Sequence, residues 1–405
     1  MTAPHAAPHA ATPRHRVVIV GGGNAGISLA AKLQRGGCPD VALVEPQDVH
    51  HYRPMLSYVA GGAATLEDLR RPQVDVVPRG VHWYADRVTS VDPEASVVHL
   101  ASGERIGYGD LVLCPGSEVD WDAVPGLRDA VATPHASTSY LPEHAPGTWQ
   151  MLSALTSGHA VFAISDQHVP CSPVGLKPLL MAADHWRQAG VLDAITIDLL
   201  VEGSRLVGTA RADRELREAA AGYGVRVRTG TALTQVDPGT RTLHLRTPDG
   251  TDTLGYDALY VAPPHRAPAW VAASGLATDD SEGFVAVDPG TLRHRTLPHV
   301  WALGDVATVD TSPSGGALRK QVPVVAHNIP AARVGAPLRL YDGYTIAPVT
   351  TSRSELLLAE HDRDGHEEPT VPFPDLARPR RSLYLFDRYL EPQVYWHRLL
   401  RGKVS

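Results

Sequence analysis

At residues 17–26 the chain reads Val-Val-Ile-Val-Gly-Gly-Gly-Asn-Ala-Gly. Four consecutive β-branched residues predict a strand that is buried on both faces. Gly21, Gly23 and Gly26 then form the pattern G-x-G-x-x-G, and apolar residues continue from Ile27 to Gly36 with the spacing of a helix. The stretch therefore predicts a strand, a tight turn and a helix in direct succession.

Each glycine of the pattern has a physical task in a dinucleotide-binding turn. Gly21 allows the tight turn, Gly23 lets the backbone approach a pyrophosphate, and Gly26 lets the helix pack on the strand. The free N–H groups and the dipole of the helix N-terminus hold the phosphate charge. A second apolar strand, residues 41–44, ends at Glu45, whose carboxylate is placed to take the ribose hydroxyls. The alternative is a glycine-rich turn without a ligand, and the complete set of elements favours dinucleotide binding. The predicted contacts are made by Gly21, Gly23, Asn24, Ala25, Gly26 and Glu45.

The composition excludes several classes of protein. A chain of 405 residues suggests two or three domains. Its formal net charge of −7 gives no general attraction to nucleic acid. The three cysteines, Cys38, Cys114 and Cys171, form no disulfide framework and fit a reducing compartment, so we expect a cytoplasmic protein. No metal site is predicted.

The two ends of the chain carry no membrane-spanning signal. Residues 1–15 are rich in Ala, Pro and His and lack a basic start followed by an apolar core, so they predict a disordered tail and no signal peptide. No run of eighteen apolar residues occurs anywhere. Residues 380–403 mix aromatic and basic side chains, which suits either an interfacial segment or a cap that packs over the protein. We expect weak or no membrane contact, with peripheral attachment at the inner face of the membrane as the alternative.

A second α/β unit begins with an apolar strand at residues 160–164. No G-x-G-x-x-G follows it, and a loop containing Cys171 leads into a helix predicted from about residue 174 to 188. A further strand, residues 195–201, ends at Glu202, which could take a ribose. Because the glycine turn is missing beside it, NAD(P)H binding in this unit is not expected.

Several pieces of the sequence match one family when they are taken together. The glycine turn, Glu45 and residues 111–116 and 301–307 resemble the flavoproteins with two dinucleotide folds that are related to glutathione reductase. Within that superfamily the chain resembles sulfide:quinone oxidoreductase, in its mitochondrial-type branch. The pieces that carry this narrower resemblance are residues 51–54, residues 121–127, Pro170-Cys171 with Lys177, residues 341–345 with Pro348, residues 357–360 and residues 395–402.

The resemblance implies an α/β fold with two tandem Rossmann-like dinucleotide-binding domains, as in glutathione reductase, and a C-terminal cap. The first domain would be discontinuous in sequence. The implied boundaries are 1–15 for the disordered tail, 16–120 and 284–340 for the two parts of the FAD-binding domain, 121–283 for the second Rossmann-like domain, and 341–405 for the cap.

The resemblance also implies FAD as the cofactor and adds residues to its site. The aspartate of the Gly304-Asp305 turn would hold the ribitol and phosphate. Lys320 resembles a lysine that lies near the pyrimidine edge of the flavin, where a fixed cation stabilises the anionic reduced form; the alternative is a surface lysine at the start of a helix. The further cofactor-binding residues implied are Arg53, Val88, Pro115, Gly116, Gly304, Asp305 and Lys320.

The family relays sulfur between two cysteines, and this chain retains one of them. Cys171 occupies the first position, before a predicted helix whose dipole should lower the pKa of the thiol. Val306 occupies the second position. We therefore expect Cys171 and Lys320 to be the catalytic residues and the substrate to supply the missing sulfur. A small buried hydrophobic role for Cys171 is the alternative.

The expected function is oxidation of sulfide or a small thiol or persulfide through Cys171. Electrons would leave through FAD to a quinone or to O2. A flavoprotein oxidoreductase acting on an organic substrate, and a non-catalytic FAD-binding protein, are the two alternatives. The expected partners are a small sulfur-containing or organic substrate and a quinone, a homodimer is left open, and nucleic acid is not expected.

Overall fold

The computed structural model describes residues 12–371 and 373–403. Most of the disordered tail predicted for residues 1–15 lies outside the described residues. At its end the structure differs from the prediction, because the first strand, β1 (Arg14–Val20), already begins at Arg14. Arg14 and His15 pair with Gly107 and Tyr108 of a neighbouring strand, which extends the sheet to these residues.

The first domain is built on a sheet in which β1 occupies a central position. The strand order is β5-β2-β1-β8-β7-β6. β19 pairs with the C-terminal half of β8, on the edge where β7 pairs with its N-terminal half. β5, β2, β1, β8 and β19 are parallel, whereas β7 runs antiparallel to β8 and β6 to β7. The bounds are β2 (Val41–Val44), β5 (His82–Tyr84), β6 (Val88–Asp92), β7 (Val97–Leu100), β8 (Arg105–Leu113) and β19 (Val300–Ala302).

Two helices of the first domain lie side by side, α1 (Asn24–Arg35) and α10 (Leu318–Arg333). The apolar residues of α1 recur with helical spacing and are buried in the core that the sheet shares with this helix. Because β19 and α10 come from residues 300–333, this domain is assembled from two distant parts of the chain.

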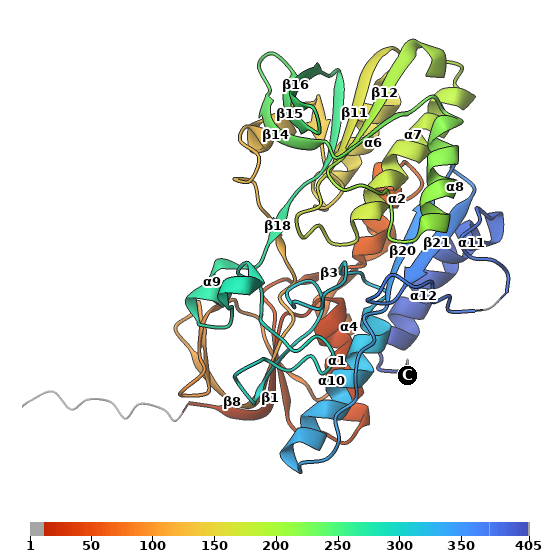
Figure 1. Ribbon diagram of the computed structural model, residues 1–405. Helices are drawn as coiled ribbons and strands as arrows, with labels where there is room; N and C mark the ends of the chain where they lie inside the picture. The colour runs from red at the N-terminus through yellow and green to blue at the C-terminus, as the bar shows by residue number, and fades with distance from the viewer. Residues whose placement is uncertain (1–11, 372, 404–405) are drawn as a thin grey trace, which may run out of the picture.

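The second domain has a five-stranded parallel sheet with the order β10-β17-β11-β12-β13. A three-stranded antiparallel sheet, β14-β15-β16, is attached to it. Figure 1 shows this domain above the first one. Its elements are β10 (Ala136–Ser137), α6 (Ala145–Ala154), β11 (Gly158–Ile164), α7 (Leu176–Gln188), β12 (Ile195–Val201), α8 (Ala210–Ala221), β13 (Arg226–Thr229), β14 (Ala232–Asp237), β15 (Thr242–Thr247), β16 (Gly250–Gly255) and β17 (Ala258–Ala262).

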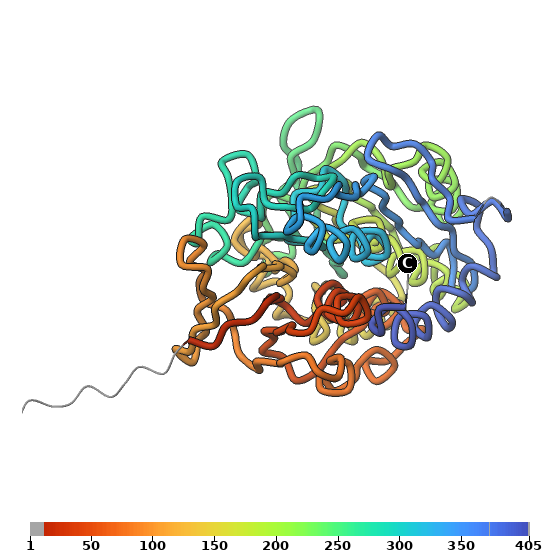
Figure 2. The backbone as a smooth tube through the Cα atoms, turned by 90° about the horizontal axis from the view of Figure 1, so that it is seen from below, coloured from red at the N-terminus to blue at the C-terminus, as the bar shows by residue number. Residues whose placement is uncertain are grey.

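The C-terminal segment contacts both domains. The hairpin β20 (Thr345–Thr350) and β21 (Leu356–His361) contributes apolar side chains to the core of the second domain. The helical turns that follow contribute Tyr395 and Trp396 to the core of the first domain, and Figure 2 shows them beside α1. These turns are α11 (Arg381–Leu385), the π-helical turn η5 (Phe386–Leu390), α12 (Glu391–Val394) and the π-helical turn η6 (Tyr395–Leu399).

Shorter elements complete the fold around the two sheets. In the described ranges, no helix is both long and apolar enough to cross a membrane. The remaining elements are β3 (Val49–His51), η1 (Arg53–Met55), α2 (Leu56–Ala60), α3 (Leu66–Leu69), β4 (Arg70–Pro72), α4 (Gln73–Val76), β9 (Glu118–Val119), α5 (Leu127–Val131), η2 (Ser172–Gly175), η3 (Leu192–Ala194), β18 (His265–Arg266), α9 (Ala269–Ala273) and η4 (Asp279–Ser281).

Candidate functional site

The glycine turn between β1 and α1 has the geometry that a dinucleotide requires. Gly21 has a φ of +100°, and a Cβ atom there would lie 2.2 Å from the carbonyl oxygen of Cys114. A Cβ atom on Gly26 would lie 1.8 Å from the carbonyl oxygen of Gly21. At Gly23, in contrast, a Cβ atom would meet nothing within 4 Å, so the backbone faces open space. The turn is closed against the protein on one side and accessible to a phosphate on the other.

The first turn of α1 offers free backbone donors beside that open space. The helix begins after Gly23, and no side chain caps it. The first N–H groups of a helix have no acceptor within the helix and favour an anion. Asn24 donates its side-chain amide to the carbonyl oxygen of Gly315 over 3.4 Å, which ties this turn to the loop before α10.

Glu45 is fixed where β2 ends. Its carboxylate accepts hydrogen bonds from the backbone N–H of Gly22 at 2.6 Å and of Gln47 at 2.8 Å. Both bonds hold the carboxylate beside the glycine turn and leave lone pairs on each oxygen. This geometry fits the ribose contact predicted for Glu45.

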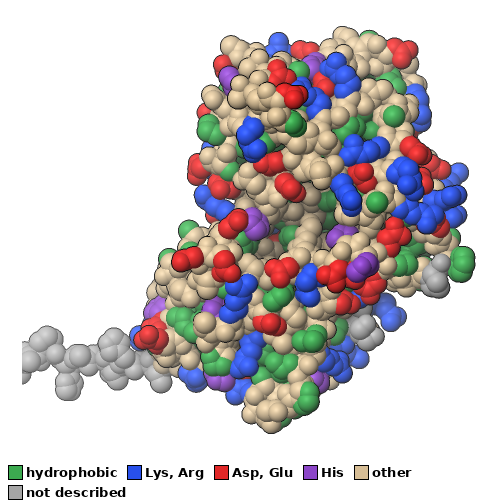
Figure 3. Space-filling model, viewed as in Figure 1, with side chains coloured by type: hydrophobic (Ala, Val, Ile, Leu, Met, Phe, Trp, Pro, Cys, Tyr) green, Lys and Arg blue, Asp and Glu red, His purple; other side chains and the backbone are tan. Residues whose placement is uncertain are grey.

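Three neighbouring parallel strands end at the same level and form a crevice. Val20 at the end of β1 pairs with Leu113 at the end of β8, which also pairs with Ala302 at the end of β19. The residues that follow are the glycine turn, Pro115-Gly116 and Gly304-Asp305. Ligands of open α/β sheets bind at the carboxyl ends of the strands. Figure 3 shows that this face of the molecule is hollowed between the two domains.

Asp305 lies in this crevice with a perturbed carboxyl group. Burial raises its pKa, and the positive charge of Arg53 acts in the opposite direction. Gly304, which has a φ of +77°, donates its N–H to the side-chain oxygen of Gln321 over 2.9 Å and so fixes the turn. The free amides, the open glycine and the two carboxylates fit the two ends of an FAD molecule.

For two of the cofactor-binding residues implied by the resemblance, Val88 and Lys320, the described contacts do not test the predicted role. Val88 is buried at the start of β6, and β7 separates that strand from β8. The ammonium of Lys320 binds Asp342 and Glu368, each over 2.7 Å, and lies 4.3 Å from the ring centroid of Tyr344. Two carboxylates therefore neutralise the charge that was expected to act on the flavin, and the roles of both residues stay predictions.

Cys171 is held between the loop after Asp305 and the C-terminal hairpin. Its backbone N–H donates to the carbonyl oxygen of Pro313 at 2.7 Å, and its sulfur lies 3.6 Å from the carbonyl oxygen of Ile346. The residue has a φ of +49°, a left-handed conformation that costs energy for a side chain other than glycine. Contacts from two distant segments thus fix the position of this residue.

The expected lowering of the Cys171 pKa is wrong. Burial raises the pKa of the thiol to about 12, the carboxylate of Asp305 acts in the same direction, and the ammonium of Lys177 acts against both. The sequence predicted a helix from about residue 174, just after Cys171, whereas Cys171 precedes the short 3-10 turn η2 and α7 begins only at Leu176. The helix dipole falls off within one turn, so desolvation dominates.

No second cysteine is bonded to Cys171. Cys38, Cys114 and Cys171 are all free thiols. Cys114 is buried in the core of the first domain, and Val306, at the position where the resembled family has its second cysteine, is fully buried in the same core. Cys171 is therefore a free thiol that forms no disulfide with Cys38 or Cys114.

Comparison with known proteins identifies the family. The family model described as pyridine nucleotide-disulphide oxidoreductase matches residues 15–160 and 181–332. The chain belongs to this family. The match leaves out residues 161–180, which include Cys171.

Two relatives of this pyridine nucleotide-disulphide oxidoreductase share one name. Mitochondrial sulfide:quinone oxidoreductase of Dictyostelium discoideum is 31% identical over 392 residues, which cover 96% of this chain and 86% of the relative. The protein of that name from Mus musculus is 30% identical over 393 residues, which cover 96% and 87%. The chain is thus a sulfide:quinone oxidoreductase-like member of the family, and the predicted enzyme class, an FAD-dependent oxidoreductase, is confirmed.

A solved structure supports the fold. The sulfide:quinone oxidoreductase from the hyperthermophilic bacterium Aquifex aeolicus superposes with a TM-score of 0.79 and covers 97% of this chain and 92% of its own. The two sequences are 19% identical, so this likeness concerns the fold alone. It confirms the predicted α/β architecture with Rossmann-like domains.

Sequence reasoning missed the buried side chains that hydrogen-bond to the glycine turn of this oxidoreductase. His50 is buried, and burial lowers the pKa of its ring to about 4, so the ring is neutral. Its Nδ1 lies 3.1 Å from the carbonyl oxygen of Gly22 and its Nε2 lies 2.5 Å from the hydroxyl of Tyr395. The carbonyl oxygen can only accept, so Nδ1 carries the proton and Nε2 accepts from Tyr395. Gln73 donates a second hydrogen bond to the same carbonyl at 2.9 Å.

A buried ion pair near Cys171 was also not predicted, although Lys177 itself is one of the residues that carry the resemblance. Lys177 is 1% exposed, and its ammonium lies 2.9 Å from the carboxylate of Asp387 in the C-terminal segment. The hydroxyl of Tyr58 donates to the same carboxylate at 2.6 Å. Asp387 lies 210 residues beyond Lys177, so no local pattern in the sequence could have indicated the pair.

Two further aromatic groups were missed in this region. The hydroxyl of Tyr140 is buried with no hydrogen-bond partner in the described structure, and the charges of Cys171 and Asp305 both act on it. The ring of Tyr140 lies 5.3 Å from that of His265. Burial lowers the pKa of His265 to about 4, so it is a neutral imidazole.

The second domain does not offer the glycine cradle of the first. The carboxylate of Glu202 accepts from the hydroxyl of Ser165 at 3.0 Å and from the N–H of Asp166 at 3.1 Å, and pairs with Arg246 at 3.3 Å. Glu202 is therefore engaged by its own domain. NAD(P)H binding there stays unexpected.

Proposed function

We propose that this protein oxidises sulfide, or a small thiol or persulfide, at Cys171. The observation that carries the proposal is the position of this sulfur, held by Pro313 and Ile346 next to the loop that follows Asp305. The relatives of the chain support it, because both are named mitochondrial sulfide:quinone oxidoreductase. FAD, when bound in the crevice, supplies a two-electron acceptor.

The lone sulfur requires an external partner. The Cys171 thiolate and a hydrosulfide ion form one S–S bond and give up two electrons and one proton, which leaves a persulfide on Cys171. An external thiolate then attacks the outer sulfur atom. The S–S bond breaks, the Cys171 thiolate is restored, and the sulfur leaves as a small persulfide. No second protein cysteine is needed for this cycle.

The surroundings of Cys171 control its protonation. The thiol has a pKa of about 12, so it holds its proton at neutral pH, and Lys177 is the cation that favours the thiolate. We assign Lys177 to stabilising the charge that remains once the thiol proton has left.

The outer face of the C-terminal segment indicates where the electron acceptor binds. Exposed large apolar side chains gather there, whereas Asp387 and Glu391 of the same segment pair with Lys177 and Arg319 inside the protein. The exposed side chains are Leu385, Phe386, Tyr389 and Leu390. We propose that this face contacts the surface of the inner membrane leaflet from the cytoplasm and receives a quinone there, with O2 as the other acceptor. The homodimer stays a prediction.

A second candidate function keeps FAD and changes the substrate. Val306 favours it, because a fully buried valine stands where the resembled family has its second cysteine. In that case an organic molecule is oxidised and Cys171 is inert. A non-catalytic flavoprotein would be reduced by neither class of compound.

Anaerobic reduction of the purified yellow protein separates these functions. Sulfide, a small thiol, NADH and NADPH are added in parallel, and bleaching of the flavin absorbance is followed. We expect sulfide to bleach the wild type and the Cys38→Ala control, and not Cys171→Ala. Bleaching of the Cys171→Ala variant at the wild-type rate would refute the role of this sulfur.

A further inference from the structure

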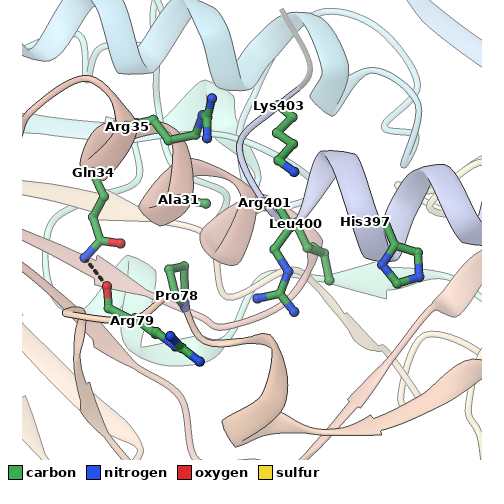
Figure 4. Close-up of a pocket in the computed structure, with 9 residues that line it drawn as sticks. All are labelled: Ala31, Gln34, Arg35, Pro78, Arg79, His397, Leu400, Arg401 and Lys403. Carbon is green, nitrogen blue, oxygen red and sulfur yellow. Dashed lines mark hydrogen bonds between the residues drawn. The ribbon is translucent and has the colours of Figure 1, made fainter.

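A groove of about 780 Å³ lies on the first domain, away from the carboxyl ends of the strands. Three segments form it: the end of α1, the loop at residues 78–79, and the chain from residue 397 to 403. Figure 4 shows that side chains from all three surround one space. The lining residues are Ala31, Gln34, Arg35, Pro78, Arg79, His397, Leu400, Arg401 and Lys403. Its size is within the range of small-molecule sites.

All charged groups that line this groove are basic. Arg35, Arg79, Arg401 and Lys403 are exposed, and no lining residue is acidic. Within the described part of the chain, none of these four has a carboxylate partner; Arg401 donates to the backbone carbonyl oxygen of Asp75 at 3.1 Å. Some exposed arginines elsewhere do pair with an acid, as Arg226 does with Asp198. The groove therefore concentrates positive charge that the protein itself does not neutralise.

The walls of the groove are fixed before any ligand binds. Gly402 has a φ of +63°, and a Cβ atom there would lie 2.7 Å from backbone atoms of α1, so the chain between Arg401 and Lys403 is pressed against that helix. Gln34 donates to the carbonyl oxygen of Arg79 at 2.9 Å, which ties α1 to the loop. Leu400 is 1% exposed and anchors the same segment in the core. Such preorganisation lowers the entropic cost of binding.

The dipole of α1 does not neutralise this charge. The groove lies at the C-terminal end of the helix, which carries about half a negative charge. Four guanidinium and ammonium groups carry about four positive charges. An anion with several oxygen atoms is the chemistry that satisfies them, since arginine forks bind phosphate oxygens in pairs.

We propose that this groove binds a phosphate-bearing anion with more than one negative charge. The bound anion joins the end of the C-terminal segment to α1 and to the loop at residue 79, and so stabilises the docking of the cap. The ligand is either a free phosphate compound or the headgroup of an acidic phospholipid, and both present the same oxygen atoms. This site is independent of Cys171 and of the proposed redox reaction.

Binding is measured on the full-length flavoprotein by calorimetry and by thermal unfolding at low ionic strength. The probes are inorganic pyrophosphate, vesicles of phosphatidylglycerol with phosphatidylcholine, and vesicles of phosphatidylcholine alone. We expect pyrophosphate or the acidic vesicles to bind, and the double variant Arg79→Ala/Arg401→Ala to bind about tenfold more weakly. Binding of pyrophosphate identifies a free phosphate site, and binding of the acidic vesicles alone identifies a headgroup site.

Arg214→Ala is the matched control, because Arg214 is an exposed arginine on α8 of the second domain. It should bind each probe like the wild type. The proposal is overturned if neither pyrophosphate nor the acidic vesicles bind, if the double variant binds as tightly as the wild type, or if Arg214→Ala weakens binding as much. Reduction of the flavin by sulfide is measured in parallel and should not change, so a failure of this proposal is distinct from a failure of the redox proposal.

Discussion

Replacing Lys177 with methionine tests the group that connects the cap to the region of Cys171. Lys177 is 1% exposed, and its ammonium binds Asp387, which is 12% exposed, over 2.9 Å. Methionine keeps most of the side-chain volume and removes the charge. Of these two hydrogen bonds to the carboxylate of Asp387, only the one from the hydroxyl of Tyr58 then remains.

The expected cost follows from the burial of both partners. Breaking a buried ion pair on one side leaves an uncompensated charge and costs about 3–5 kcal/mol. In a chain of this size that loss corresponds to a fall in Tm of about 4–6 °C. The double variant Lys177→Met/Asp387→Asn carries no orphaned charge, and its amide oxygen still accepts from Tyr58, so we expect it to recover most of the loss.

The same variant tests the electrostatics of Cys171. The positive charge of Lys177 lowers the pKa of this thiol against the effect of burial. Without it the thiolate fraction falls, so alkylation of Cys171 by iodoacetamide at pH 8 should slow severalfold in a Cys38→Ala background. Tm values of Lys177→Met and the double variant that equal the wild type, together with unchanged alkylation, would show that the pair does not act as the structure indicates.

Three further outcomes follow from the described contacts. Gly23→Ala should fold with a normal Tm and lose FAD affinity, because its Cβ atom meets only open space in the protein. Gly26→Ala should fail to fold or lose several degrees of Tm, because its Cβ atom would lie 1.8 Å from a backbone oxygen. Circular dichroism and flavin content distinguish the two variants. Burial lowers the pKa of both His50 and His265 to about 4. Between pH 6.5 and 4 the unfolded chain therefore binds protons that the folded protein does not, so stability should fall as the pH is lowered through this window. A pH-independent Tm there would contradict the burial of both rings. Alkylation of Cys171 should rise with pH throughout the range from 7 to 10 without a plateau, because burial raises its pKa to about 12; a plateau below pH 9 would contradict that shift.

Local patterns predicted the parts of the site that local chemistry determines. The turn at Gly21 and Gly26 could be predicted because each glycine avoids a collision with a backbone oxygen that is close in sequence or on an adjacent strand. Glu45 could be predicted because it ends the strand after the glycine turn, and parallel strands end at one edge of a sheet. These features depend on periodicity and spacing, which a single sequence carries.

The remaining features depend on contacts between distant segments. The hydrogen bond of His50 to Tyr395 joins residues 345 positions apart, and no period in the sequence marks it. The sign of the Cys171 pKa shift was predicted wrongly because the prediction relied on the dipole of the helix that follows, while the burial that decides the shift comes with segments around residues 313 and 346. Lys320 was predicted from a resemblance in position, and its ion pairs with Asp342 and Glu368 depend on the path of the cap.

The cap is best understood as a structural part of the cofactor domain. Its inward side supplies Tyr395, which supports the carbonyl oxygen of Gly22 through His50, and Asp387, which neutralises Lys177 of the second domain. Gly402 is pressed against α1, the helix whose first turn is predicted to face the cofactor phosphates. Apolar residues on the outer side do not account for these contacts, because a segment that served only to meet a membrane would not need buried polar groups on its inner side. The cap therefore holds both domains in register around the crevice.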